Sequence, residues 1–126
     1  MKIGVDARKI LRNATGLGNY GRTLVCNMSE LIEADDSLLL FSPDEGKRAL
    51  KAISIPENGN LVVPEKSPIP FYKRWWQLKG MVKDIRKHEV NVFHGLNAEL
   101  PKGISKVVPA ILTVHDLIFL RHSESV

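Results

Sequence analysis

Residues 16–21 read Gly-Leu-Gly-Asn-Tyr-Gly, a glycine spacing that is typical of segments that hold phosphate groups. Glycine lets backbone amides approach an anion closely, and the positive end of a following helix favours negative charge there. A nucleotide-binding fingerprint normally follows its strand directly, whereas about ten residues separate Asp6 from this segment. Gly16, Gly18 and Asn19 are therefore candidate phosphate contacts, and close helix–sheet packing is the alternative role of the glycines.

Two histidines stand at the ends of predicted strands. His94 ends residues 90–94, and His115 ends residues 110–115 and is followed by Asp116. Because an open parallel sheet binds ligands at the carboxyl ends of its strands, either imidazole can contact a sugar hydroxyl or a leaving phosphate. The alternative for each histidine is a structural hydrogen bond to a backbone carbonyl. Asp116 is a further candidate for contact with a substrate.

Asp6 and Arg8 come at the end of the first predicted strand, residues 2–6. The two side chains can pair and shape the chain after the strand, or Arg8 can face a phosphate. We expect a structural role for Asp6 and leave the role of Arg8 open. The histidines and acids of the chain lack the spacing of metal ligands, so no metal site is expected.

Strand-like and helix-like segments alternate along the chain. Short apolar runs predict strands at residues 2–6, 38–41, 60–63, 90–94 and 110–115, and apolar spacings of three and four predict helices near 17–34, 43–53 and 71–88. Residues 7–18 are predicted to be a loop. This order predicts an α/β domain with a Rossmann-like, doubly wound parallel sheet of about five strands.

The composition excludes several classes of protein. A chain of 126 residues with 44% hydrophobic and 25% charged residues has the size and composition of one globular domain. No apolar run reaches the ~20 residues of a membrane-spanning helix, and the single cysteine, Cys26, excludes an internal disulfide. The net charge is +4, but aromatic residues make up only 6%, so nucleic acid is not an expected partner. A cytoplasmic location is expected, either free or at the inner face of the membrane.

Four motifs carry a resemblance to a known family. They are Ile3-Gly4-Val5-Asp6-Ala7-Arg8, Thr15-Gly16-Leu17-Gly18-Asn19-Tyr20, Asn91-Val92-Phe93-His94-Gly95 and Thr113-Val114-His115-Asp116-Leu117. Together they resemble the N-terminal domain of retaining glycosyltransferases with two facing Rossmann-like domains (the GT-B fold, family 4, group 1), notably the mannosyltransferase-like branch. The resemblance extends from Lys2 to about Phe119. In this family a longer segment separates the first strand from the glycines, as it does here.

The resemblance implies a reaction and roles for particular residues. Such enzymes move a sugar from a nucleotide-sugar to a glycan or lipid-linked acceptor with retention of configuration, commonly in polysaccharide biosynthesis. The nucleotide-sugar is a substrate, and no cofactor or metal is implied. The family pattern places Gly16 and Gly18 near the donor diphosphate and His115 at the donor sugar, with His94 and Asp116 as further contacts. Asn19 departs from the basic residue that is often found at its position in the family.

The resemblance also implies that residues 1–126 form only the acceptor-side domain, the truncated N-terminal half of the fold. The donor-binding basic residues and paired glutamates of the family belong to a C-terminal domain that is absent from this sequence. We therefore expect the chain to be inactive by itself and to expose apolar surface that favours self-association.

Two other functions compete with this interpretation. The first is an NAD(P)-binding oxidoreductase domain, which would need an acid at the end of the second strand, where the sequence has Ser42-Pro43. The second is a non-catalytic regulatory or membrane-docking module. Its support is the segment Phe71–His88, where Trp75 and Trp76 follow two basic residues and suit a peripheral contact with an anionic bilayer. An amphipathic core helix with a solvated basic face is the simpler explanation of that segment.

Overall fold

A parallel sheet forms the centre of the computed structural model, which describes residues 1–12, 14, 16–65, 67–95 and 103–112. Its strands are β1 (Lys2–Asp6), β2 (Ser37–Phe41), β3 (Gly59–Val62), β4 (Val92–Gly95) and β5 (Ala110–Leu112). They lie in the order β3-β2-β1-β4-β5, and every neighbouring pair is parallel. The prediction of an α/β domain with a parallel sheet of this size is confirmed, and the strand order is compatible with a Rossmann-like fold.

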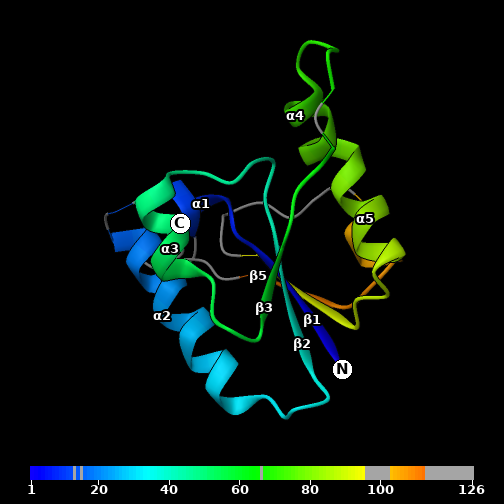
Figure 1. Ribbon diagram of the computed structural model, residues 1–126. Coiled ribbons are helices and arrows are strands. Elements are labelled where there is room, and N and C mark those ends of the chain that lie inside the picture. Colours follow the sequence, from blue (N-terminus) through cyan, green and yellow to red (C-terminus); the bar gives the residue numbers. More distant parts are fainter. Residues whose placement is uncertain (13, 15, 66, 96–102, 113–126) are drawn as a thin grey trace, which may run out of the picture.

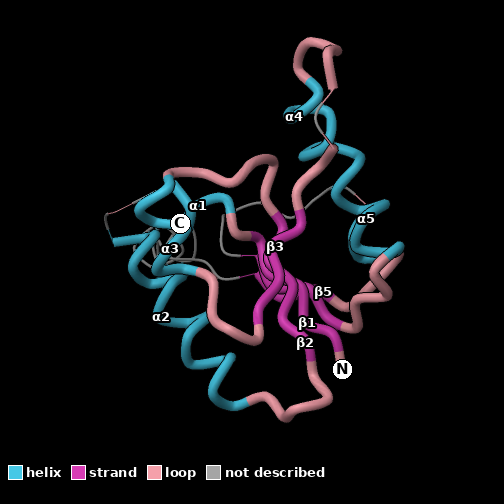
Figure 2. Tube along the Cα trace, in the orientation of Figure 1, coloured by secondary structure: helices cyan, strands magenta, loops and turns pink. Residues whose placement is uncertain are grey.

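Helices cover both faces of the sheet (Figures 1 and 2). On one side lie α1 (Arg8–Arg12), α2 (Gly16–Leu31) and α3 (Arg48–Ser54), and on the other lies α5 (Met81–Lys87), which follows α4 (Tyr72–Trp75) and the π-helical turn η1 (Trp76–Gly80). A short 3₁₀ turn, η2 (Ile104–Lys106), precedes β5. Continuously apolar strands form because side chains on both faces of such a sheet are removed from water.

The central strands divide the core into two layers. Val5, Leu38 and Leu40 belong to the cluster under α1 and α2, whereas Leu39 and Phe41 belong to the cluster under α5. This alternation follows from the opposite directions of successive side chains in a strand. Burial of such apolar side chains contributes about 1.5–3 kcal/mol each.

Gly4 allows β1 to pack closely against the side chains of the second core layer. A Cβ atom at Gly4 would lie 3.1 Å from the rings of Phe41 and Phe93 and from Val90. The two rings themselves meet edge to face, with centroids 6.1 Å apart. A larger residue at Gly4 would therefore push these aromatic side chains apart.

The chain after β1 differs from the prediction. Residues 7–18 were expected to form a loop, but the structure has α1 at Arg8–Arg12 and begins α2 at Gly16. The helix α1 forms because Ile10 and Leu11 are fully buried in the first core layer, which outweighs the lack of a strong local helix signal. Two apolar residues at helical spacing in α2 lie outside the core, since Leu31 is 82% exposed and Tyr20 is 46% exposed.

The predicted helix at residues 71–88 is interrupted by η1. Trp76 is almost fully buried, and its ring lies against Gly80, where a Cβ atom would come within 2.7 Å of Cδ1. Its Nε1 donates to Asp84 Oδ2 at 2.6 Å. A π-helical turn inserts one extra residue into the helical repeat, and here it occurs where the indole occupies the space above Gly80.

The turn before α3 requires a glycine at position 46. The backbone N–H of Gly46 donates to Asp44 Oδ1 at 2.9 Å, and the next amide, Lys47, donates to the carbonyl of Leu11 at 2.9 Å. This turn delays the helix predicted for residues 43–53, which begins at Arg48. Gly46 has a φ of +68°, and a Cβ atom there would lie 2.5 Å from the Leu11 carbonyl oxygen.

Gly46→Ala is expected to lower the free energy of unfolding by roughly 1–3 kcal/mol, because the left-handed backbone and the contact with Leu11 both oppose a side chain. Urea denaturation measures the change. Gly103→Ala is the matched control, since Gly103 has a φ of +85° but nothing within 4 Å of its added Cβ. Equal losses in the two variants would contradict the proposed contact with Leu11.

Candidate functional site

The strand order reverses direction at β1, so the switch point of the sheet lies between β1 and β4. From β1 the chain continues to β2 on one side, and β4 lies on the other side. Open parallel sheets bind ligands at such a switch point. His94 belongs to β4 and Arg8 follows β1 by two residues, and β1 pairs with β4 so that Val5 lies opposite His94.

A buried ion pair stands at the end of β1. The carboxylate of Asp6 is fully buried, and Arg8 donates to both of its oxygens, from Nε at 3.0 and 3.1 Å and from Nη2 at 2.7 Å. The backbone N–H of Arg8 also donates to Asp6 Oδ1 at 3.1 Å. This confirms the structural role expected of Asp6. The Arg8 side chain stays 25% exposed, so it also reaches the surface at this edge.

His94 lies within β4 rather than after it, since the strand continues to Gly95. Its side chain is half-buried, and burial lowers the pKa of the imidazole below its ordinary value of 6.5. At neutral pH the ring is therefore uncharged, with one nitrogen that donates and one that accepts. A neutral imidazole suits a hydrogen bond to a hydroxyl group better than the binding of an anion.

The glycine motif lies within the first turns of α2 instead of in a loop. Gly16 is exposed at the start of the helix, and an added Cβ would meet nothing within 4 Å. Gly18 and Gly21 are buried. The two proposed roles of the motif are therefore divided among its members: Gly18 and Gly21 suit close packing, whereas Gly16 stands where helical N–H groups lack intrahelical partners.

Arg22 joins the start of α2 to α1, and the sequence analysis did not identify this residue. Its side chain is buried, with Nη1 donating to the carbonyl of Ile10 at 2.7 Å and Nη2 donating to Asn19 Oδ1. The hydroxyl of Ser54 donates to the same Ile10 carbonyl at 3.1 Å. The available signal was an arginine one helical turn after Asn19, on the face that carries the buried Val25. Arg22 thereby joins the start of α2 to α1 and holds the side chain of Asn19.

Asp44, which follows β2, interacts with two basic side chains. Its carboxylate pairs with Arg12 and accepts from Lys73 Nζ at 3.1 Å, in addition to the Gly46 N–H. Burial raises the pKa of Asp44, but these hydrogen bonds and the charge of Arg12 outweigh it and hold the pKa below its ordinary value. Asp44 thus anchors α4, through Lys73, to the carboxyl edge of the sheet.

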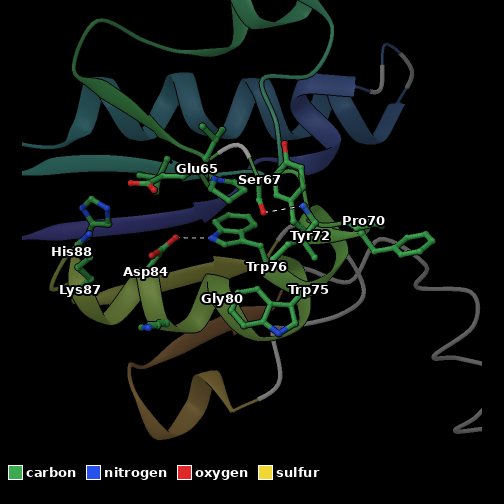
Figure 3. A pocket seen from close by; sticks show the side chains of 16 residues that line it. Glu65, Ser67, Pro70, Tyr72, Trp75, Trp76, Gly80, Asp84, Lys87 and His88 are labelled. Carbon is green, nitrogen blue, oxygen red and sulfur yellow. Dashed lines mark hydrogen bonds between the residues drawn. The ribbon is translucent and has the colours of Figure 1, made fainter.

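A groove opens between the connector after β3 and the helices α4 and α5 (Figure 3). It has a volume of about 960 Å³, and apolar side chains such as Val62, Pro64, Tyr72 and Trp76 form much of its wall. Asp84 also lines it, with its carboxylate bonded to Trp76. Sequence analysis identified the tryptophans but could not predict a groove, because it depends on how the connector folds back.

Two of the predicted site residues, His115 and Asp116, lie outside the described residues. Within the described part of the chain, no three His, Cys, Asp or Glu side chains are grouped so that they could share a metal ion. Among those same residues no helix has both the length and the apolar character needed to cross a membrane.

Comparisons with protein-family models, curated proteins and solved structures give no match to this chain. The functional argument therefore depends on the arrangement of the residues themselves.

The lowered pKa of His94 predicts a pH dependence of stability. The unfolded chain takes up a proton near pH 6.5, whereas the folded chain does so only at lower pH. Stability is therefore complete above the unfolded value and is lost as the pH falls toward the folded value. We expect urea denaturation to show a larger loss between about pH 7.5 and 5.5 for the wild type than for His94→Gln. Contributions from the other histidines cancel in this comparison, and parallel curves for the two proteins would show that His94 is not shifted.

Proposed function

We propose that this chain is the acceptor-side domain of a retaining glycosyltransferase that uses a nucleotide-sugar. The observation that carries the proposal is the meeting of β1 and β4 at the switch point of the sheet, with His94 near the end of β4 and Arg8 two residues beyond the end of β1. The four sequence motifs that resemble the family supply the reaction class. Fold alone would not, because parallel α/β domains serve many functions.

The chemistry of the proposed reaction suits these groups. When the bond between the sugar and the diphosphate breaks, negative charge grows on the departing phosphate oxygen. Backbone N–H groups at the start of α2 and the guanidinium of Arg8 stabilise such charge without reorganising. A neutral imidazole such as His94 can hold a hydroxyl of the sugar or the acceptor. In the resembled family the residue that matches His115 contacts the donor sugar, and we propose the same role for it here.

The oxidoreductase alternative has less support. A nicotinamide dinucleotide needs a carboxylate near the end of the second strand to hold the ribose. The chain after β2 offers Asp44, but Arg12, Lys73 and the Gly46 N–H already occupy its oxygens. A ribose would have to displace these partners. We therefore prefer the glycosyltransferase proposal.

Gly16→Asp separates a binding role of α2 from a structural one. A carboxylate at a helix start stabilises the fold by about 0.3–1 kcal/mol, and the open space at Gly16 accepts the side chain. The same charge would repel a phosphate. We expect donor hydrolysis by the proposed two-domain enzyme, measured across UDP- and GDP-sugars, to fall by about 100-fold, a loss typical of a removed oxyanion contact.

Gly16→Asn is the control, because it has nearly the same shape without the charge. It should keep hydrolysis close to the wild-type rate. If Gly16→Asp hydrolyses the donor as fast as the wild type does, the start of α2 does not contact the donor phosphates, and its glycines serve only packing.

A further inference from the structure

Three apolar side chains are more than half exposed on the segment that joins β3 to α5. Phe71 is 82% exposed, Ile69 is 68% exposed and Trp75 is 58% exposed. We call these three residues the apolar tip. The segment extends away from the body of the domain at the carboxyl edge of the sheet (Figure 1). Figure 3 shows the indole of Trp75 on a different side of the helix from that of the buried Trp76. The apolar tip is thus a surface and not part of the core.

The backbone at the apolar tip is held in an unusual conformation. Phe71 has a φ of 64°, in the left-handed region, which a bulky residue rarely adopts. Such strain tends to occur at functional positions, where the surrounding structure holds it in place. The Phe71 carbonyl accepts from the N–H of Trp75 at 3.0 Å, and Lys73 is tied to Asp44. The exposed ring of Phe71 is therefore presented by a fixed turn.

Positive charge is concentrated beside the apolar tip. Residues 71–88 contain six basic residues and one acid, Asp84, whereas the whole chain has a net charge of +4. The net charge of these 18 residues alone is therefore larger than that of the entire chain. The carboxylate of Asp84 is bonded to Trp76, and Lys79 and Lys83 are exposed. Lys79 and Lys83 follow Trp75 in the same helical segment, so exposed positive charge comes directly after the apolar tip along the chain.

We propose that this surface docks on an anionic lipid bilayer, with the apolar tip inserted among the headgroups and Lys79 and Lys83 against the anionic lipids. Projecting aromatic and aliphatic side chains next to a basic helix face are the features of interfacial membrane contacts. A nucleic-acid surface would instead align aromatic rings with the basic residues along a groove. In this chain the residues of the apolar tip are close together in sequence on the projecting segment. The proposal does not depend on the glycosyltransferase function.

Vesicle sedimentation tests the docking proposal. The chain is mixed with phosphatidylcholine vesicles that do or do not contain about one-third phosphatidylglycerol, at low and at high salt. We expect binding to the anionic vesicles, weakened by salt, and little binding to phosphatidylcholine alone. Each basic residue near such a surface changes the partition coefficient about fivefold, so Lys79→Gln with Lys83→Gln should weaken binding roughly 30-fold. Phe71→Asn should also weaken it, and asparagine tolerates the left-handed backbone.

Matched controls lie on helices of the opposite layer. Leu31 is as exposed as Phe71, at 82%, so Leu31→Asn removes equal apolar surface from the end of α2. Lys9→Gln with Arg48→Gln removes the same charge from α1 and α3. These variants should bind as the wild type does, and circular dichroism should show all variants folded.

Two results would overturn the proposal. One is equal weakening by the control variants, which would mean that the net charge of the whole chain or non-specific hydrophobic adsorption causes the sedimentation. The other is tighter binding to a fluorescent single-stranded or duplex oligonucleotide than to the vesicles under the same salt, with loss in Lys79→Gln with Lys83→Gln. That outcome would assign the surface to nucleic acid.

Discussion

Asp6 is a carboxylate with no exposure to water at the end of the central strand, and burying such a charge without a partner would cost several kcal/mol. The chain satisfies it within two residues, because Arg8 donates to both carboxylate oxygens from its guanidinium and to one of them from its backbone. This requirement fixes the direction in which the chain leaves β1. It determines where α1 begins, and α1 in turn leads to the start of α2.

Side-chain hydrogen bonds then hold the neighbouring helices in place around α1. Arg22 bonds the carbonyl of Ile10 and so holds α2 against α1, while Ser54 brings α3 to the same carbonyl. Across the sheet, Asp44 links the chain after β2 to Lys73 of α4. The carboxyl edge therefore has two parts, the polar ends of β1 and β4 at the switch point and a basic, partly apolar projection. The first is the proposed site of chemistry, and the second is the proposed membrane contact.

Sequence patterns predicted the sheet well, since runs such as residues 38–41 are buried on both faces and have few alternatives to a parallel strand. They failed where tertiary contacts determine which residues form a helix and which side of it is buried. Ala7, Ile10 and Leu11 stand at helical spacing, but this run is too short to predict a helix by itself, and α1 forms because Ile10 and Leu11 meet the core. Tyr20 and Leu31 match a helical period but lie on the exposed side of α2, since the glycines and Arg22 occupy the buried side. Of the predicted site residues, Arg8 and His94 lie at or just beyond the ends of the neighbouring strands β1 and β4, and Gly16 begins α2, whereas Gly18 is buried.

The central claim is that the carboxyl edge at the switch point binds the phosphate and sugar groups of a nucleotide-sugar. Amide chemical shifts of the ¹⁵N-labelled chain, followed while UDP- and GDP-sugars are added to millimolar concentration, test it most directly. The account predicts saturable shifts at the amides of Gly16, Gly18 and Asn19 and at Arg8, larger for the sugar nucleotide than for the free sugar. Saturable shifts confined to other parts of the chain, with these amides unchanged, would contradict it.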